Sequence, residues 1–211
     1  MHIYAFGSVC RGEIDIGSDI DLLAIVDGYD SRFDPSIYSI YTLARLKEIW
    51  KEGNPFAWHL ALESKLIYSD DGKDILQNLG MPKVYANAKF DCTKFYNIFL
   101  KASNSLYSSV NSKIFDLSTI FLSIRNIATC YSLQAFDQPD FSRNSARRLG
   151  DISIPISEEV YRLYERSRIL CTRGYGEKLT NQEILIAVNS IETIKIWMLS
   201  LIENLEGNNN E

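Results

Sequence analysis

Two short apolar segments near the start of the chain, separated by a glycine turn, constrain its fold more than any other feature. His2–Phe6 is typical of a buried strand, and Gly7-Ser8 interrupts it. Asp19–Val26 predicts a second strand, which alternates at first and is then continuously apolar. Side chains two residues apart in a strand point to the same side of it. We therefore expect the carboxylates of Asp19 and Asp21 to project together.

The residues of this turn and strand suit phosphate and metal binding. A glycine after a strand allows a tight turn and a close approach to a ligand. Backbone N–H groups and the Ser8 hydroxyl can then donate hydrogen bonds to phosphate oxygens, and Arg11 can neutralise phosphate charge. Two adjacent carboxylates repel each other unless a cation lies between them. Mg²⁺ prefers oxygen ligands of this kind, so the pattern favours a metal site over two surface aspartates beside a turn.

The same residues resemble the nucleotidyltransferase superfamily of the DNA polymerase β-like type. Its signature is Gly-Ser, about ten residues and then Asp-x-Asp, here Gly7-Ser8 and Asp19-Ile20-Asp21. The gap and the triplet Arg11-Gly12-Glu13 resemble minimal and aminoglycoside nucleotidyltransferases. The resemblance implies that Mg²⁺ or Mn²⁺ binds at Asp19 and Asp21. It also implies that a nucleoside triphosphate such as ATP binds at a phosphate-binding set, transfers its nucleoside monophosphate to a hydroxyl acceptor and releases pyrophosphate. That set is Gly7, Ser8, Arg11 and Ser18.

Members of that superfamily usually carry a third acidic residue on a later strand. The segment that we expect to form this strand, Phe56–Leu62, has His59 at its centre, and Glu63 follows it. Three readings stay open. His59 acts as the base or orients one, Glu63 supplies the third carboxylate, or the third site is lost and activity is weak. His59 can also be a simple packed residue.

The chain changes character at about residue 89. Before it, Asp34-Pro35 predicts the start of a helix that runs to Gly53, and residues 70–79 predict a short helix that Gly80 caps. After it, we expect only helices, at about 91–110, 113–136, 157–172 and 181–205, with Asn181 at the start of the last. The sequence thus predicts an α+β protein with a small mixed sheet in a nucleotidyltransferase domain (1–88) and an all-α bundle (89–211).

The helical half resembles the HEPN domains that accompany minimal nucleotidyltransferases. Its segment 115–133 carries Arg125-Asn126, but Cys130 stands where a HEPN ribonuclease has histidine. Without that histidine, RNA cleavage lacks its usual acid–base group. The apolar stripe of 184–201 is either bundle core or the interface of a homodimer.

The distribution of charge along the sequence bears on which kinds of molecule the protein can bind. The net charge of −5 falls entirely in residues 1–88, which disfavours a nucleic-acid partner there. The four cysteines are widely spaced and are expected to be reduced thiols. We expect no membrane span, a cytoplasmic location, and a protein or small-molecule acceptor. The alternative function is a nucleotide-binding regulatory module, similar to an antitoxin, with little catalytic activity.

Overall fold

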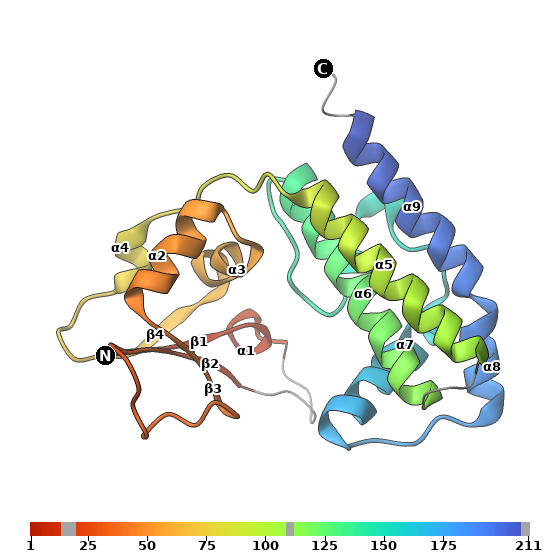
Figure 1. Cartoon of the computed structure of the whole chain (residues 1–211), viewed down its shortest axis with the longest axis horizontal. Coiled ribbons are helices and arrows are strands. Elements are labelled where there is room, and N and C mark those ends of the chain that lie inside the picture. Colours follow the sequence, from red (N-terminus) through yellow and green to blue (C-terminus); the bar gives the residue numbers. More distant parts are fainter. Residues whose placement is uncertain (14–19, 109–111, 208–211) are drawn as a thin grey trace. The chain divides into compact units, whose positions relative to one another are not determined.

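The computed structural model describes residues 1–13, 20–108 and 112–207. These form two compact units, Met1–Ala86 and Asn87–Glu211, which Figure 1 shows in the warm and cool ends of its colour scale. The first unit contains the whole sheet, and the second is helical. The predicted α+β class, with a small mixed sheet followed by a helical bundle, is confirmed.

The sheet has four strands in the order β3-β2-β1-β4. Both neighbours of the central strand β1 (His2–Phe6), which are β2 (Asp21–Ile25) and β4 (Lys65–Ser69), run antiparallel to it. The edge strand β3 (Tyr38–Tyr41) is parallel to β2. The first predicted strand is confirmed residue for residue, and β2 lies inside the second.

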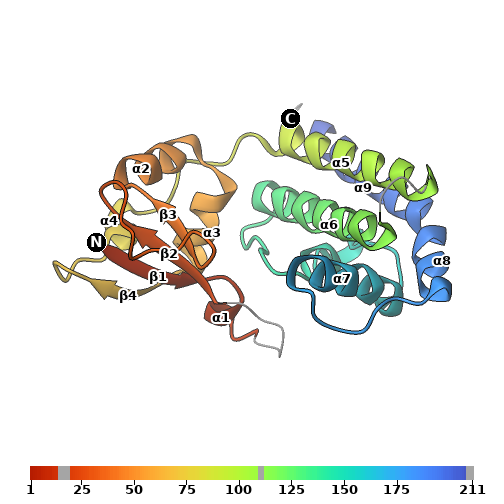
Figure 2. The same ribbon diagram turned by 60° about the horizontal axis from the view of Figure 1, so that its bottom comes forward.

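Three helices cover one face of this sheet, as the two views of the ribbon show (Figures 1 and 2). They are α2 (Leu43–Glu52), α3 (Pro55–Glu63) and α4 (Ile75–Leu79). The core that they form with the sheet comprises Tyr4, Phe6, Leu23, Ile25, Leu46, Ile49, Trp50, Ala57, Leu60 and Leu76. On the opposite face, Phe33 from the β2–β3 connection packs with Ala24 and Val26.

The prediction of a helix from Asp34-Pro35 to Gly53 is wrong for its first half and right for its second. Asp34 instead closes a turn, in which its Oδ1 accepts a hydrogen bond from the Ser36 N–H at 2.8 Å. The residues that follow form β3, which pairs with the edge of β2. The hydrogen bonds of this pairing stabilise a strand more than the local sequence stabilises a helix. Thr42 then caps α2 by accepting from the Arg45 N–H.

The strand expected at Phe56–Leu62 is also wrong, because this segment is helix α3. Its start is well specified: the Asn54 side chain accepts from the Phe56 N–H at 2.8 Å, and Pro55 occupies the first helical position. His59 and Glu63 are consequently one helical turn apart and share a face. The helix expected from residue 70 begins only at Ile75, with Asp74 as its cap, while Gly80 ends it as predicted.

The second unit is a helical bundle. It contains α5 (Ala88–Ser108), α6 (Lys113–Ala135), α7 (Glu158–Arg173), α8 (Asn181–Asn189) and α9 (Ile191–Gly207). Helix α6 packs against α5, α7 and α9. The connection before α7 holds two short 3₁₀ turns, Ser145–Arg147 (η1) and Gly150–Ile152 (η2). The predicted helices are confirmed, except that the last is divided at Ser190 and its capping residue is Thr180, one position before Asn181.

The stretch Asn181–Glu206 is long and apolar enough to cross a membrane by length and composition alone. One such stretch is weak evidence, since a core helix of a soluble protein passes the same test. Ile184, Ala187, Ile191, Ile194 and Met198 are buried within the bundle. Of the most apolar part of this stretch, 33% is buried inside the protein.

Candidate functional site

The Gly7 turn and the Asp21 carboxylate meet at one end of β1. The antiparallel register pairs Phe6 with Asp21, so Gly7 follows directly beside that aspartate. Gly7 has φ 75° and ψ −144°, a conformation that is essentially restricted to glycine. A Cβ added there would lie 2.5 Å from Asp21 Oδ2. The structure therefore brings together one residue from each half of the motif, in a contact that only a glycine permits.

A short helix, α1 (Ser8–Arg11), begins immediately after Gly7. The N–H groups of Cys10 and Arg11 both donate to the Gly7 carbonyl, at 3.1 and 3.3 Å, and Gly12 ends the helix in the left-handed conformation. Backbone N–H groups at the start of a helix lack intrahelical acceptors, which is why phosphates bind readily at such places. Ser8 stands at this start.

Two of the predicted site residues, Ser18 and Asp19, lie outside the described residues. Their roles remain predictions from the sequence. Asp21 is the first residue of β2 and its side chain is exposed. Among the strand residues that the structure describes, Asp21 is the only acidic one. None of these strands therefore supplies the third carboxylate that the resemblance led us to expect.

Arg11, His59 and Glu63 form a hydrogen-bonded array beside this turn. The Arg11 guanidinium donates to Glu63 through Nη1, and to Glu13 through Nε at 2.9 Å. His59 Nε2 lies 2.9 Å from the same Glu63 oxygen, and its ring meets that of Phe6 edge to face at 5.5 Å. The array connects α1 to α3 and thereby supports the turn that carries Gly7.

Arg11, which we expected to bind phosphate, is paired with carboxylates in this array. Burial by itself lowers the pKa of Arg11, but its hydrogen bonds and ion pairs with Glu13 and Glu63 outweigh that effect and raise it. The guanidinium thus already has two carboxylate partners. Sequence reasoning did not assign a role to Glu13, although the triplet Arg11-Gly12-Glu13 was a visible signal. Glu63, for its part, is engaged by a cation and an imidazole.

A second acidic group lies at the other end of β1. The ligand-type atoms of His2, Asp70 and Asp71 all lie within 4.8 Å of one another, a spacing that could hold a metal ion. Because β1 pairs His2 with Ser69 and Phe6 with Asp21, this group is about 13 Å along the strand from the Gly7 end. The sequence motif does not include any of these residues.

The carboxylates of this second group are engaged by the protein itself. Asp71 Oδ1 lies 3.0 Å from His2 Nε2 and accepts from the Ser69 hydroxyl at 2.9 Å and from the Lys73 N–H at 3.1 Å. These bonds, the Lys73 backbone bond foremost, lower the pKa of Asp71 well below its ordinary value. Asp70 pairs with the amino group of Met1. We therefore interpret this group as a structural cluster whose hydrogen bonds join the end of β4 to the start of β1.

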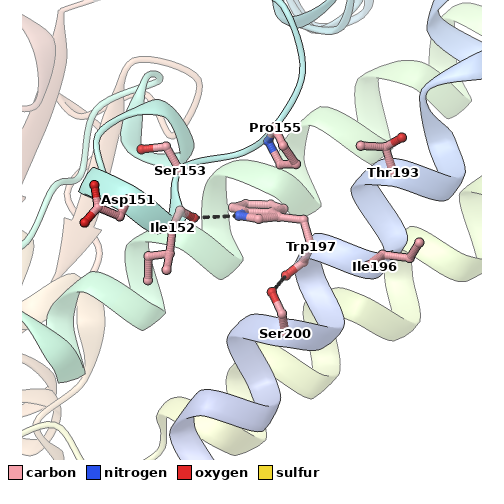
Figure 3. Close-up of a pocket in the computed structure, with 8 residues that line it drawn as sticks. All are labelled: Asp151, Ile152, Ser153, Pro155, Thr193, Ile196, Trp197 and Ser200. Atoms are coloured by element: carbon pink, nitrogen blue, oxygen red, sulfur yellow. Dashed lines mark hydrogen bonds between the residues drawn. The ribbon is translucent and has the colours of Figure 1, made fainter.

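The helical unit contains a pocket of about 390 Å³ between α9 and η2 (Figure 3). The Trp197 indole N–H donates across it to the Ile152 carbonyl at 2.9 Å, and the Ser200 hydroxyl donates to the Trp197 carbonyl. Asp151 is the one titratable residue in its lining. A single carboxylate in a mostly apolar pocket carries no acid–base or metal chemistry, so the Gly7 end of β1 remains the candidate site.

Comparison with known proteins supports this choice of site. Residues 2–81 match the model of the nucleotidyltransferase domain family, a span that includes the sheet, the Gly7 turn and Asp21. Neither the curated proteins nor the solved structures contain a match to this chain. The family match ends before the helical unit, whose likeness to HEPN domains therefore stays a prediction. The match to residues 2–81 supports placing the N-terminal unit in the nucleotidyltransferase superfamily, and with it a transferase activity in general.

Proposed function

We propose that this protein is a divalent-metal-dependent nucleotidyltransferase that moves a nucleoside monophosphate, AMP from ATP in the first instance, to a hydroxyl group. The observation that carries the proposal is the contact between Gly7 and the Asp21 carboxylate. This contact supports the proposal because a glycine turn suited to phosphate and a carboxylate suited to a metal adjoin within the span of the family match.

The residues at this end of β1 fit a magnesium or manganese ion. Asp21 is an exposed residue with carboxylate oxygens, which are the ligands that such hard cations prefer, and the sequence adds Asp19 two residues before it. These two side chains would hold the metal. When bound, the ion supplies charge stabilisation to the phosphate oxygens and aligns the attacking and leaving groups.

The protein's own groups then bind and orient the substrate. The backbone after Gly7 and the Ser8 hydroxyl hold the triphosphate, and Ser18 is a further candidate from the sequence. The acceptor oxygen forms a bond to the α-phosphorus, and the bond from that phosphorus to the bridging oxygen breaks. Pyrophosphate leaves with the electron pair. The acceptor proton passes to a base, for which His59 and Glu63 are the two candidates.

The second candidate function is a regulatory module that binds nucleotide and turns it over poorly. The observation that favours it is the absence of an acidic residue from β3 and β4, together with the pairing of Glu63 to Arg11 and His59. If the third carboxylate is missing, or is engaged by other side chains, a transferase still binds its substrate but activates the acceptor hydroxyl weakly.

The acceptor is a protein side chain or a small molecule, and we favour a protein. In this proposal the protein works in the cytoplasm. A homodimer through the helical unit is compatible with the proposal and is not required by it.

The test is incubation of the full chain with each α-labelled nucleoside triphosphate and Mg²⁺ or Mn²⁺, with and without cell lysate. We expect pyrophosphate release and transfer of label, both lost in Asp21→Ala and in Asp19→Ala. Nucleotide binding without release across metals and acceptors would favour the regulatory module. Turnover retained in the double variant would refute the proposed metal site.

A further inference from the structure

A groove of about 440 Å³ lies in the first unit, away from the Gly7 turn. Its residues come from α2 and from the segment that follows α4, and none of them belongs to the candidate site. The lining comprises Lys47, Trp50, Lys51, Leu79, Met81 and Lys83. The volume falls within the range of ligand pockets, roughly 300–1,000 Å³. The groove combines an apolar floor with a rim of three lysines.

Hydrogen bonds hold the two walls of the groove together. The Trp50 indole N–H donates to the Gly80 carbonyl at 2.9 Å, and the Lys83 N–H donates to the Trp50 carbonyl at 2.9 Å. The Trp58 indole N–H donates to the Lys83 carbonyl at 3.0 Å. Gly53 packs so closely that an added Cβ would lie 2.5 Å from the same carbonyl. The groove is therefore pre-formed, which reduces the entropic cost of binding.

The floor of the groove exposes apolar surface. Met81 is 57% exposed and Leu79 is partly buried, while Trp50 lies beneath them and is almost fully covered. An apolar floor bordered by charged side chains has the layout of a protein interface, which combines an apolar centre with a polar rim. An apolar side chain from a partner would remove Met81 from water.

The rim is unusual for this unit, whose net charge is negative. Within the part of the chain that the structure describes, none of the three lysines has a carboxylate within ion-pair distance. The acidic residues of α2, Glu48 and Glu52, are both engaged by Arg45. Lys47 and Lys51 are one helical turn apart, and like charges at that spacing destabilise a helix slightly. An acidic ligand would relieve this repulsion.

We propose that the groove is a docking site for an acidic segment of a protein partner, in which an apolar side chain is flanked by carboxylates. The apolar side chain would contact Met81 and Leu79, and the carboxylates would pair with the three lysines. Charge complementarity selects this occupant, because three uncompensated cations surround the apolar floor. The docking site requires neither nucleotide nor metal, so it stands independently of the proposed transferase activity.

A nucleic acid is the less suitable polyanion for this surface. The floor is aliphatic where exposed, and its tryptophan is too deeply covered to stack on a base. Residues 1–88 carry a net charge of −5, so a long phosphate backbone would meet repulsion beyond the three lysines. A short acidic peptide avoids that repulsion because its contacts end at the rim.

The experiment measures fluorescence anisotropy of a labelled synthetic peptide, with one central leucine flanked by glutamates, at low ionic strength and without nucleotide. We expect saturable binding to the full chain that weakens roughly tenfold in Lys47→Gln/Lys51→Gln. Met81→Ser should weaken it several-fold. A peptide with glutamines in place of the glutamates should not bind.

The matched control is Lys94→Gln/Lys101→Gln, which removes two charges from exposed positions of α5 and should bind like the unaltered protein. Circular dichroism establishes that each variant is folded, and the α2 pair is expected to fold well because its substitution removes a repulsion. Three results would overturn the proposal. They are no binding of the acidic peptide, equal binding by the α2 and α5 variants, or an oligothymidylate that binds as tightly with the same lysine dependence.

Discussion

The two ends of β1 each gather carboxylates, yet they differ in what surrounds them. At the His2 end, Asp71 accepts hydrogen bonds from a hydroxyl and a backbone N–H and lies beside an imidazole, and Asp70 pairs with an amino group. At the Phe6 end, Asp21 is exposed and lies against a glycine whose positive φ is essentially restricted to glycine. Spacing alone favours the first end as a metal site, whereas the turn chemistry and the resemblance of Gly7-Ser8 and Asp19-Ile20-Asp21 to the nucleotidyltransferase signature favour the second.

Close spacing of ligand-type atoms does not by itself decide which of the two ends binds a metal. A carboxylate that already accepts several hydrogen bonds is stabilised in its charged form and must give up those partners to bind an ion. A glycine held at positive φ against a carboxylate has no comparable structural purpose at a plain hairpin turn. Glycine in such a conformation is a common choice where a ligand must approach the backbone closely.

The sharpest test of the comparison is metal binding. We expect Asp21→Asn to weaken Mn²⁺ binding by more than about 100-fold, because loss of a direct ligand exceeds the roughly 10–100-fold cost of losing a residue that only orients a ligand. Asp70→Asn/Asp71→Asn should leave the affinity unchanged. Electron paramagnetic resonance of free Mn²⁺ measures both in the presence of ATP. The reverse pattern would move the metal site to the His2 end.

The next effect is that of Gly7→Ala. The backbone strain should cost about 1–3 kcal/mol of unfolding free energy. The new Cβ would also displace the Asp21 carboxylate, so nucleotide affinity should fall about tenfold or more. Denaturant unfolding and nucleotide titration measure the two effects.

Gly28→Ala is the matched control for that variant. Gly28 also has a positive φ, of 105°, but an added Cβ there meets nothing within 4 Å. It should therefore reproduce part of the loss in stability while leaving nucleotide affinity intact. Equal affinity losses in the two variants would mean that the Gly7–Asp21 contact has no particular role.

A smaller effect is expected from the array that supports the Gly7 turn. Glu63→Gln should destabilise the protein by about 1–2 kcal/mol, because Arg11 and His59 both lose a charged partner in a largely buried place. A double-mutant cycle with His59→Ala should be non-additive, since both residues belong to one network.

Transfer kinetics then separate the two roles left open for Glu63. If Glu63 only supports the turn, the transfer rate should fall no further than the fraction of folded protein falls. If it is the base, the rate should collapse while the protein remains folded. Glu13→Gln serves as the control, since it removes the other carboxylate partner of Arg11 and leaves His59 untouched.

The smallest effect is a pH dependence at the His2 end. The pKa of Asp71 is lowered in the folded protein, so its contribution to stability is present above the ordinary aspartate range. It is lost as the pH falls below about 4. Asp71→Asn should flatten the melting temperature over that acid range, whereas Asp27→Asn should not. An unchanged acid slope in Asp71→Asn would show that the cluster contributes nothing to folding.

The same pair of residue types starts a helix at one place in this chain and not at another. Asn54-Pro55 and Asp34-Pro35 are both an N-cap type of residue followed by proline, but only Asp34-Pro35 was interpreted as a helix start, and a strand was expected after Asn54-Pro55. The first starts α3, because an apolar segment follows that packs on the sheet. The second closes a turn, because Tyr38–Tyr41 finds a ladder on β2. The competing partner lies far away in sequence, so local propensity does not reveal it.

The sequence by itself determined the elements whose signals are local. The strand His2–Phe6, the break at Gly7, the second strand and the long helices after residue 87 all follow from short-range apolar pattern and capping chemistry. The tertiary structure alone decided the pairing of Phe6 with Asp21, the joining of Arg11 to Glu63, and the lysine rim of the α2 groove. Each of these depends on which distant residues come into contact, and the free energy of such contacts comes from packing and long-range hydrogen bonds.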